Sequence, residues 1–364
     1  MSRLFIGVMT GTSIDGLDAA LVELDGRGVD GTVARLVRAV SLPLGACQRP
    51  LRELADQTPM TAGAIAELCR DFSLLHADAI TRLRGGDAVE AACVHGQTVF
   101  HRPPVSWQLV SAPLVAHTAR VPVVADLRAA DLATGGQGAP LTPLSDYVLF
   151  RDRAHGEARI VVNLGGFANA TLLGAAAGER GFKGRDLCTC NQLLDLVARR
   201  TMGAPFDESG AAALAADPDD DALDDLLGIL RVQGAAGRSL GTGDEASAWI
   251  GRHWKGGAGV PGAALAASAC EAIGQVIGDE ARRADAQRVI VAGGGVRNRA
   301  LMRAIEGCSS CRVEESAAHG VPVELREAVG WAVLGALAWD GEALPLRHIT
   351  GASADVRAGI VARV

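Results

Sequence analysis

The feature of this sequence that most limits its possible folds is a strand, a glycine-containing turn and a second strand that occur twice. The first copy has predicted strands at residues 4–9 and 17–24, and the second, about 150 residues later, has them at 159–162 and 170–173. The first strand of each copy is a short apolar run, as in buried strands. Because an internal repeat of this size indicates two similar domains, the sequence predicts a duplicated α/β protein with a cleft between its halves.

The turn of the first hairpin, at residues 10–16, has a composition suited to phosphate. Gly11 and Gly16 allow backbone N–H groups to point at one anion, and the hydroxyls of Thr10, Thr12 and Ser13 add further donors. An ordinary hairpin with a polar glycine turn is the alternative.

Two carboxylates, Asp15 and Asp18, lie in or beside the same turn. Carboxylates next to phosphate repel it unless a cation lies between them, so they predict Mg²⁺ on a bound nucleotide. The turn of the second hairpin, which contains Gly165 and Gly166, would supply a phosphate contact from the other half of the chain.

Composition narrows the class of protein. The chain has 364 residues, enough for two domains, and its net charge of −7 argues against nucleic acid as the main partner. Eight cysteines, several within apolar runs, are typical of buried free thiols, and the lone C-x-x-C at 308–311 lacks the second pair that a zinc site needs. With no signal peptide and no long apolar run expected, we predict a soluble protein of a reducing cytoplasm.

Two polar clusters follow predicted strands between the hairpins. His95 begins the sequence HGQT after a strand at 89–94, and strand ends are where open α/β sheets place their chemistry. Asp126 and Arg128 would point to one side of an extended segment and could hold a polyol or a carboxylate. The run GGQGAP at 135–140, with Gln137, would let backbone approach a ligand. The structural alternatives are a satisfied strand-end histidine and a salt-bridged crossover loop.

The second half of the chain contains a further carboxylate and a glycine triplet. Asp186 precedes a helix predicted at 192–200, whose dipole would help keep it ionised; it is either a general base or a helix cap. Gly293, Gly294 and Gly295 lie between a strand at 288–292 and a helix at 298–305, where their backbone could contact a base or ribose. The sequence has neither the G-x-G-x-x-G fingerprint nor a G-x-x-x-x-G-K-[ST] loop.

Taken in order, these segments resemble the anhydro-N-acetylmuramic acid kinases, which have the sugar kinase/actin/heat-shock ATPase superfold. The resembling segments are VMTGTSIDGLD at 8–18, HGQT at 95–98, DLR at 126–128, GGQGAP at 135–140, NLGGFAN at 163–169, GGG at 293–295 with Asn298, EA at 327–328 and TGA at 350–352. The resemblance implies two duplicated actin-like or sugar-kinase-like domains with a central nucleotide cleft. We expect the N-terminal domain at 1–125 plus about 345–364, and the C-terminal domain at 126–344.

The family uses ATP and water to open the 1,6 bond of 1,6-anhydro-N-acetylmuramic acid, giving N-acetylmuramic acid 6-phosphate for cell-wall recycling. By resemblance, Asp186 is the base that activates the water. The polar clusters described above make His95, Asp126, Arg128 and Gln137 the expected sugar contacts. ATP would contact Gly11, Thr12, Ser13, Ile14, Asp15, Gly16, Leu17, Asp18, Gly165, Gly166, Gly293, Gly294 and Gly295. Mg²⁺ would lie at Asp15 and Asp18, and the fold implies a homodimer.

The chain departs from the family pattern at several positions. The family's Asp-Thr-Gly-Pro-Gly-Asn motif reads DLCTCN at 186–191, so Cys188 and Cys190 replace its glycines and would bring each Cβ close to sugar or phosphate, at a cost wherever φ is positive. The family's Ser-Thr-Gly-Arg-Glu loop reads SLGTG at 239–243, its Gln-x-Gly-Asp/Asn segment reads QLVS at 108–111, and an expected histidine is Asp146. Two alternatives therefore stay open: a related sugar kinase without ring opening, and a weakened paralogue that binds sugar or nucleotide.

Overall fold

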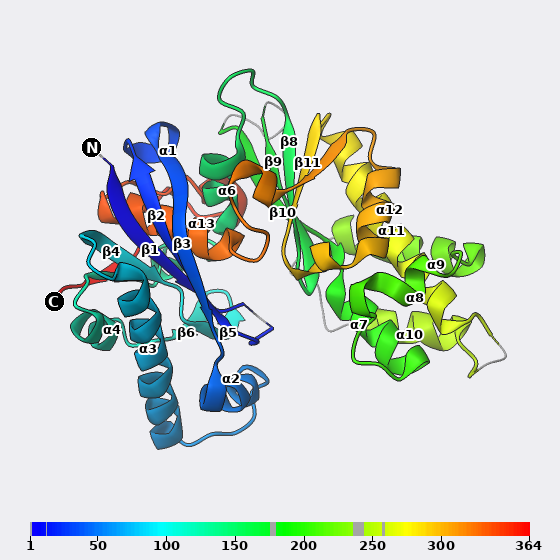
Figure 1. Cartoon of the computed structure of the whole chain (residues 1–364), viewed down its shortest axis with the longest axis horizontal. Coiled ribbons are helices and arrows are strands. Elements are labelled where there is room, and N and C mark those ends of the chain that lie inside the picture. Colours follow the sequence, from blue (N-terminus) through cyan, green and yellow to red (C-terminus); the bar gives the residue numbers. More distant parts are fainter. Residues whose placement is uncertain (1, 12, 175–179, 236–243, 257–258) are drawn as a thin grey trace. The chain divides into compact units, whose positions relative to one another are not determined.

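A computed structural model describes residues 1–364 except 1, 12, 175–179, 236–243 and 257–258. The chain divides into a first unit, residues 1–149 with 325–364, and a second unit, residues 150–324 (Figure 1). The expected boundaries near 125 and 345 differ from this division, since residues 126–149 and 325–344 belong to the first unit. The reason is that helix α13 (Arg326–Trp339) packs against the first sheet.

The first unit is built on a six-stranded sheet in the order β13-β7-β4-β1-β2-β3. Its strands are β1 (Arg3–Met9), β2 (Leu17–Asp25), β3 (Val33–Leu42), β4 (Val89–Val94), β7 (Val123–Ala125) and β13 (Ile360–Ala362). The first predicted hairpin is confirmed: β1 and β2 are antiparallel, with Arg3 opposite Leu24 and Met9 opposite Asp18. β4 runs parallel to β1, and β7 runs parallel to β4.

Helices cover both faces of this sheet, which explains the continuous apolar run of β1. Alternate residues Ile6 and Val8 join a core with helix α3 (Ala62–Arg84) and helix α4 (Ala112–Ala119). On the opposite face, α13 packs against β1, β2 and β4. Because β1 and β4 are parallel, their carboxyl ends lie at the same end of the sheet.

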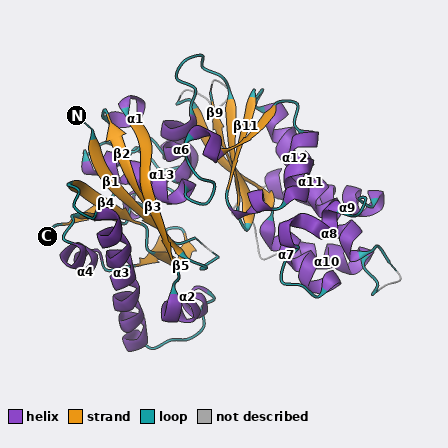
Figure 2. Cartoon of the chain, in the orientation of Figure 1, coloured by secondary structure: helices purple, strands orange, loops and turns teal. Residues whose placement is uncertain are grey.

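The second unit repeats the strand arrangement of the first (Figure 2). Its sheet has the order β10-β9-β8-β11-β12, with β8 (Arg159–Leu164), β9 (Phe167–Leu173), β10 (Phe182–Thr189), β11 (Arg288–Ala292) and β12 (Arg312–Glu315). As in β1–β2–β3, three antiparallel strands β8–β9–β10 are followed on the other side by parallel β11 and β12. The predicted duplication is therefore confirmed at the level of topology.

The other elements complete the two units. In the first unit they are α1 (Gly28–Gly31), η1 (Gly45–Cys47), α2 (Gln48–Ala55), β5 (Gln97–Arg102), β6 (Val105–Leu109), α5 (Ala129–Ala133), α6 (Thr142–Phe150, whose last residue is in the second unit) and α14 (Arg347–Thr350). In the second they are α7 (Asn191–Val197), η3 (Ala198–Met202), η4 (Glu208–Gly210), α8 (Ala211–Leu214), α9 (Asp220–Ala235), α10 (Asp244–His253), α11 (Gly262–Arg283), η5 (Gly294–Arg297), α12 (Arg299–Cys308) and η6 (Ser316–His319). None of the described helices is both long and apolar enough to cross a membrane.

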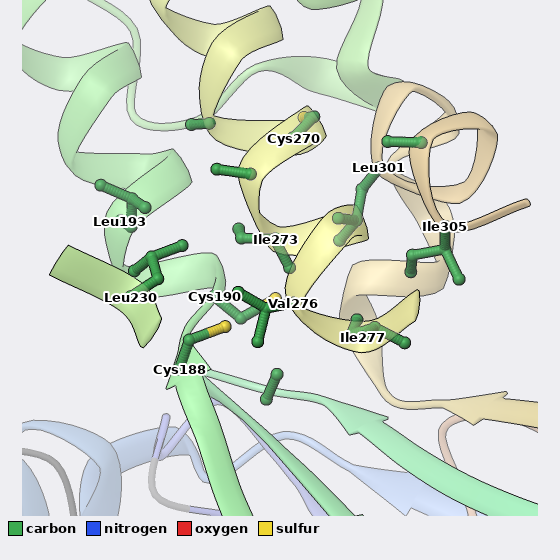
Figure 3. Packing of buried hydrophobic residues seen from close by; sticks show 14 of the residues in the cluster. Cys188, Cys190, Leu193, Leu230, Cys270, Ile273, Val276, Ile277, Leu301 and Ile305 are labelled. Atoms are coloured by element: carbon green, nitrogen blue, oxygen red, sulfur yellow. The ribbon is translucent and has the colours of Figure 1, made fainter. Parts of the chain in front are cut away.

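The two cysteines that replace the family's glycines lie in the core of the second unit. Cys188 and Cys190 are fully buried and belong to an apolar cluster that also contains Cys270 of α11 and Leu193 of α7 (Figure 3). Cys190 has a φ of −128°, so no left-handed backbone is required there. The expectation that these side chains crowd a ligand is wrong, because they fill space between β10 and the helices.

We predict that the double variant Cys188→Gly with Cys190→Gly lowers the free energy of unfolding by about 3 kcal/mol. The variant removes two buried side chains and adds backbone entropy to the unfolded chain. Urea denaturation of the two proteins measures the difference, and Cys311→Gly, at a half-buried position, should cost clearly less. Equal stability of wild type and double variant would show that the two thiols do not fill the core.

Candidate active site

The turn of the first hairpin has a fixed backbone. Its closing hydrogen bond runs from Ile14 N to the Gly11 carbonyl over 3.1 Å. Ile14 has a φ of +50°, which is unfavourable for a β-branched residue, and its buried side chain packs into the first core. Gln48 and Arg52 of α2 donate to the Ile14 carbonyl at 3.0 and 3.3 Å. The turn is therefore held in one shape by its neighbours.

Polar groups of this turn are open to a ligand or lack a partner. Ser13 and Asp15 are exposed. The Thr10 hydroxyl is buried and has no hydrogen-bond partner within the described part of the chain, a need that a phosphate or a water could meet. Of the other residues expected around phosphate, Gly11 and Gly16 are half-buried, whereas Thr12 lies outside the described residues.

The two carboxylates expected to hold Mg²⁺ differ in their surroundings. Asp15 is exposed, whereas Asp18 is half-buried in β2 and accepts a hydrogen bond from Ser41 of β3. Among the described residues there is no group of three or more histidines, cysteines or carboxylates that could hold a metal ion. The residues nevertheless fit Mg²⁺, which commonly takes only one or two protein carboxylates together with water and phosphate. Asp18 also repels a second carboxylate, Glu327, and a cation would relieve that repulsion.

His95 and Arg128 meet at the carboxyl end of β4. His95 Nε2 lies 2.9 Å from Arg128 Nη2, and because a guanidinium can only donate, the His95 proton must be on Nδ1. Burial, followed by the charge of Arg128, lowers the pKa of His95 well below its usual value, so the ring is neutral near pH 7. The ring packs against Trp331 of α13 with centroids 4.6 Å apart, and Nδ1 has no partner among the described residues.

Arg128 is a half-buried cation without a counterion in hydrogen-bond contact. Its Nη1 donates to the Gly138 carbonyl at 2.6 Å, so both of its hydrogen-bond partners, His95 and Gly138, are neutral. No described carboxylate forms a hydrogen bond with it. Burial lowers its pKa to about 10, and the negative charges of Glu327 and Asp126 oppose that shift. A cation in this state favours an anionic ligand.

Asp126 and Gln137 do not join this cluster through their side chains. The segment at Asp126 is not extended as expected: its φ is +53°, and its Oδ1 accepts a hydrogen bond from Ala129 N at 3.2 Å, at the start of α5. The expectation that Asp126 and Arg128 face one side of an extended chain is therefore wrong. Gln137 is exposed, and its backbone N donates to the Thr350 carbonyl at 2.9 Å.

Glu327, in the first turn of α13, was marked in the sequence only by resemblance and was given no role. Burial raises its pKa; Asp146 and Asp18 act in the same direction, while Arg326 and Arg128 oppose them. Glu327 therefore lies within the field of the His95 and Arg128 cluster and of the first hairpin, all within the first unit.

Asp146, which stands where the family has a histidine, forms a buried ion pair with Arg326. Arg326 Nε donates to Asp146 Oδ1 at 2.8 Å and Nη2 donates to Oδ2, with both side chains at most 3% exposed. The departure is therefore balanced by the charge of Arg326. No local sequence pattern could reveal this pair, since the two positions are 180 residues apart.

In the second unit, the turn of the second hairpin is bonded to the start of α7. The Gly166 carbonyl accepts hydrogen bonds from Cys190 N and Gln192 N at 2.9 and 3.2 Å, and the Gly165 carbonyl accepts one from Asn191 N at 3.0 Å. Three consecutive amides thus fasten the end of β10 to the hairpin turn.

Asp186 lies within β10, a strand that the sequence did not predict, beside a β-bulge. Asp186 pairs with Asn169 and Cys188 pairs with Ala168, so Leu187 is the extra residue. Asp186 is half-buried, burial raises its pKa, and no described residue donates a hydrogen bond to its carboxylate. Burial thus acts against the ionised form that the helix dipole was expected to favour, and α7 begins only at Asn191.

The glycine triplet lies against the end of β8. Gly293 has a φ of +89°, and a Cβ there would lie 2.7 Å from Asn163 Oδ1, so the position requires glycine. Gly295 is buried beside Leu164, whereas Gly294 is exposed to open space. Gly294 is thus the member of the triplet best placed to meet a ligand.

Asn191 connects these segments. Its Nδ2 donates to the Leu164 carbonyl at 3.0 Å, next to the second hairpin turn, and its Oδ1 lies close to Gly295. The second unit therefore brings together the hairpin turn, the end of the Asp186 strand and the glycine triplet. The expected loop at 239–243 lies outside the described residues.

Known proteins are similar to this chain over nearly all of its length. The family model described as anhydro-N-acetylmuramic acid kinase matches residues 3–363. Relatives of that name include one from Salinibacter ruber, 35% identical over 386 residues, covering 97% of this chain and 94% of the relative. Another, from Bordetella pertussis, is 36% identical and covers 97% and 94%, and one from Gloeobacter violaceus is 34% identical and covers 98% of both chains.

Solved structures with a similar arrangement are more distant. A ROK family glucokinase from Streptomyces griseus in complex with glucose and AMPPNP has 17% identity and a TM-score of 0.43, covering 91% of this chain and 99% of that one. The activator of the 2-hydroxyisocaproyl-CoA dehydratase from Clostridium difficile with bound ADPNP has 13% identity and a TM-score of 0.44, covering 92% and 94%. The match of the family model over residues 3–363, with relatives about 35% identical over 94% of their length, establishes that the chain belongs to the anhydro-N-acetylmuramic acid kinase family.

Proposed function

We propose that this chain uses ATP and water to convert 1,6-anhydro-N-acetylmuramic acid into N-acetylmuramic acid 6-phosphate. The observation that carries the proposal is the family match over residues 3–363. In this reaction water forms a bond to the anomeric carbon, the bond from that carbon to O6 breaks, and O6 takes the γ-phosphoryl group as ADP leaves. Peptidoglycan recycling in the cytoplasm is the corresponding role, and a homodimer is the proposed assembly.

Asp186 is the proposed general base. A carboxylate that burial makes more basic takes a proton from water more readily than an exposed one. Its carboxylate is also free of hydrogen bonds from described residues, so none of these groups competes with the water for it. The bulge at Leu187 fixes the position of Asp186 relative to the hairpin turn.

The two hairpins and the glycine triplet are the proposed ATP contacts. In the first unit these are residues 11–18, with Thr10 offering an unpartnered hydroxyl. In the second they are Gly165, Gly166 and residues 293–295, of which Gly294 is the exposed one. Asp15 and Asp18 are the residues that would hold Mg²⁺, whose charge neutralises the phosphates during phosphoryl transfer.

Arg128 and His95 are the proposed sugar contacts. Asp126, just before α5, and Gln137, in the loop at 135–140, are further proposed contacts. Muramic acid carries a carboxylate on its lactyl ether, and Arg128 is a half-buried cation whose hydrogen-bond partners are neutral. A ligand carboxylate could pair directly with the guanidinium, which no described carboxylate does through a hydrogen bond. The neutral His95 ring also has an Nδ1–H that could donate a hydrogen bond.

The binding paralogue and the sugar kinase without ring opening remain as the alternative functions, and the first has less support than the second. The paralogue alternative was suggested by Cys188 and Cys190, yet both side chains are fully buried in the core of the second unit. A sugar kinase without ring opening would use the same hairpins and the same Asp186, so product analysis must separate it.

We predict that the protein, given ATP, Mg²⁺ and 1,6-anhydro-N-acetylmuramic acid in ¹⁸O-labelled water, releases a product that has gained both a phosphoryl group and the elements of one water. Mass spectrometry reads the label, and an ADP assay gives the stoichiometry. A phosphorylated product that has not gained water would support the sugar kinase without ring opening. If neither a phosphorylated product nor ADP is formed, the result would support the binding paralogue.

We predict that Asp186→Asn lowers turnover about 1,000-fold, since general bases contribute roughly that much. ATP affinity, measured by calorimetry, should stay within about twofold, because the carboxylate acts on water. Asp195→Asn is the matched control, as Asp195 of α7 is another half-buried carboxyl whose pKa is raised by burial. Near-normal turnover of Asp186→Asn would refute the assignment.

A further inference from the structure

A buried carboxylate links the glycine-rich loop at 135–140 to the C-terminal segment of the first unit. Asp131 of α5 is 2% exposed. Its Oδ2 accepts a hydrogen bond from Gly138 N at 2.7 Å, and its Oδ1 accepts one from the Thr350 hydroxyl at 2.6 Å. The two oxygens of this carboxylate thus join the loop at 135–140 to the segment around Thr350, which lies 219 residues after Asp131 in the chain.

Three further contacts reinforce this connection. Gln137 N donates to the Thr350 carbonyl at 2.9 Å, and Ser353 donates from both its backbone N and its hydroxyl to the Thr134 carbonyl, each at 3.0 Å. We call Asp131, Thr350 and Ser353, with the loop contacts they make, the clasp.

The loop backbone passes directly over the carboxylate. A Cβ at Gly136 would lie 2.2 Å from Asp131 Oδ2, so a side chain at this position cannot be accommodated without moving the loop. Close approach to Asp131, rather than approach to a ligand, thus explains why residue 136 of the GGQGAP run is glycine.

The clasp continues into the proposed sugar contacts. The Gly138 N–H donates to Asp131, and the carbonyl of the same residue accepts from Arg128 Nη1 at 2.6 Å. Arg128 in turn donates through Nη2 to His95 Nε2 at 2.9 Å. A continuous hydrogen-bonded chain therefore runs from Thr350 through Asp131, Gly138 and Arg128 to His95.

We propose that Asp131 and Thr350 are positioning residues that set the orientation of Arg128 and the tautomer of His95, and through them the affinity for the anionic group of the sugar. The inference rests on the proposed sugar-binding role of Arg128 and His95. Neither Asp131 nor Thr350 needs to touch the sugar: with the loop held, the Gly138 carbonyl keeps Arg128 Nη1 occupied and directs the rest of the guanidinium toward His95.

We predict that Asp131→Asn raises KM for the sugar about tenfold and that Thr350→Val raises it about fivefold, as expected when a buried hydrogen bond to a charged group is lost. KM for ATP should stay within about twofold in both. Thr350→Ser, which keeps the hydroxyl, should recover most of the sugar affinity. Asp340→Asn is the control for loss of a buried carboxylate in the same unit, where Asp340 pairs with Arg3 and Arg27; it should leave KM for the sugar unchanged.

A second readout does not need turnover. Amide hydrogen exchange of Gly138 should be about tenfold faster in Asp131→Asn than in the wild type, and ¹⁵N chemical shifts of His95 should report mixed tautomers in place of the Nδ1–H form. Unchanged sugar KM in folded Asp131→Asn and Thr350→Val, or equal rises of KM for sugar and ATP, would overturn the proposal. If the wild type does not act on the anhydro sugar, the proposed function fails, while exchange at Gly138 and the His95 tautomer still decide whether the clasp positions these residues.

Discussion

The account of the second unit depends on the hydrogen bonds by which backbone amides at the start of α7 hold the turn of the second hairpin. Because the Gly165 and Gly166 carbonyls accept from residues 190–192, the hairpin and the end of β10 cannot move separately. Asp186 lies in that same strand, one bulge before the bonded segment. A carboxylate and a proposed phosphate contact are thereby fixed relative to each other by main-chain geometry alone.

The first unit reaches a comparable rigidity by other means. Its strands repeat the order and direction of the second sheet, yet its hairpin turn is held by side chains of α2, and its polar cluster by a chain of buried hydrogen bonds. Duplication has therefore preserved the sheet and changed the contacts around it.

The features that sequence predicted well are those encoded by neighbouring residues. The apolar runs of β1 and β8, the strand before Gly293 and the helix after it were placed correctly, because apolar runs and glycine turns are local signals. Contacts between distant segments were not predictable in this way. The strand and bulge at Asp186, the Asp146–Arg326 pair and the boundaries of the units all depend on partners far along the chain.

The central claim, that burial rather than a helix dipole sets the basicity of Asp186, can be tested by measuring its pKa directly. In protein with ¹³C-labelled aspartate carboxyls, the Asp186 signal is identified by its absence from Asp186→Asn, and its titration gives the pKa. We predict a value above the ordinary aspartate pKa of about 4, with the carboxylate ionised only above that raised pKa and protonated as the pH falls through it. A pKa at or below the ordinary value would contradict the account, because the carboxylate would then be solvated or stabilised by a neighbouring positive charge.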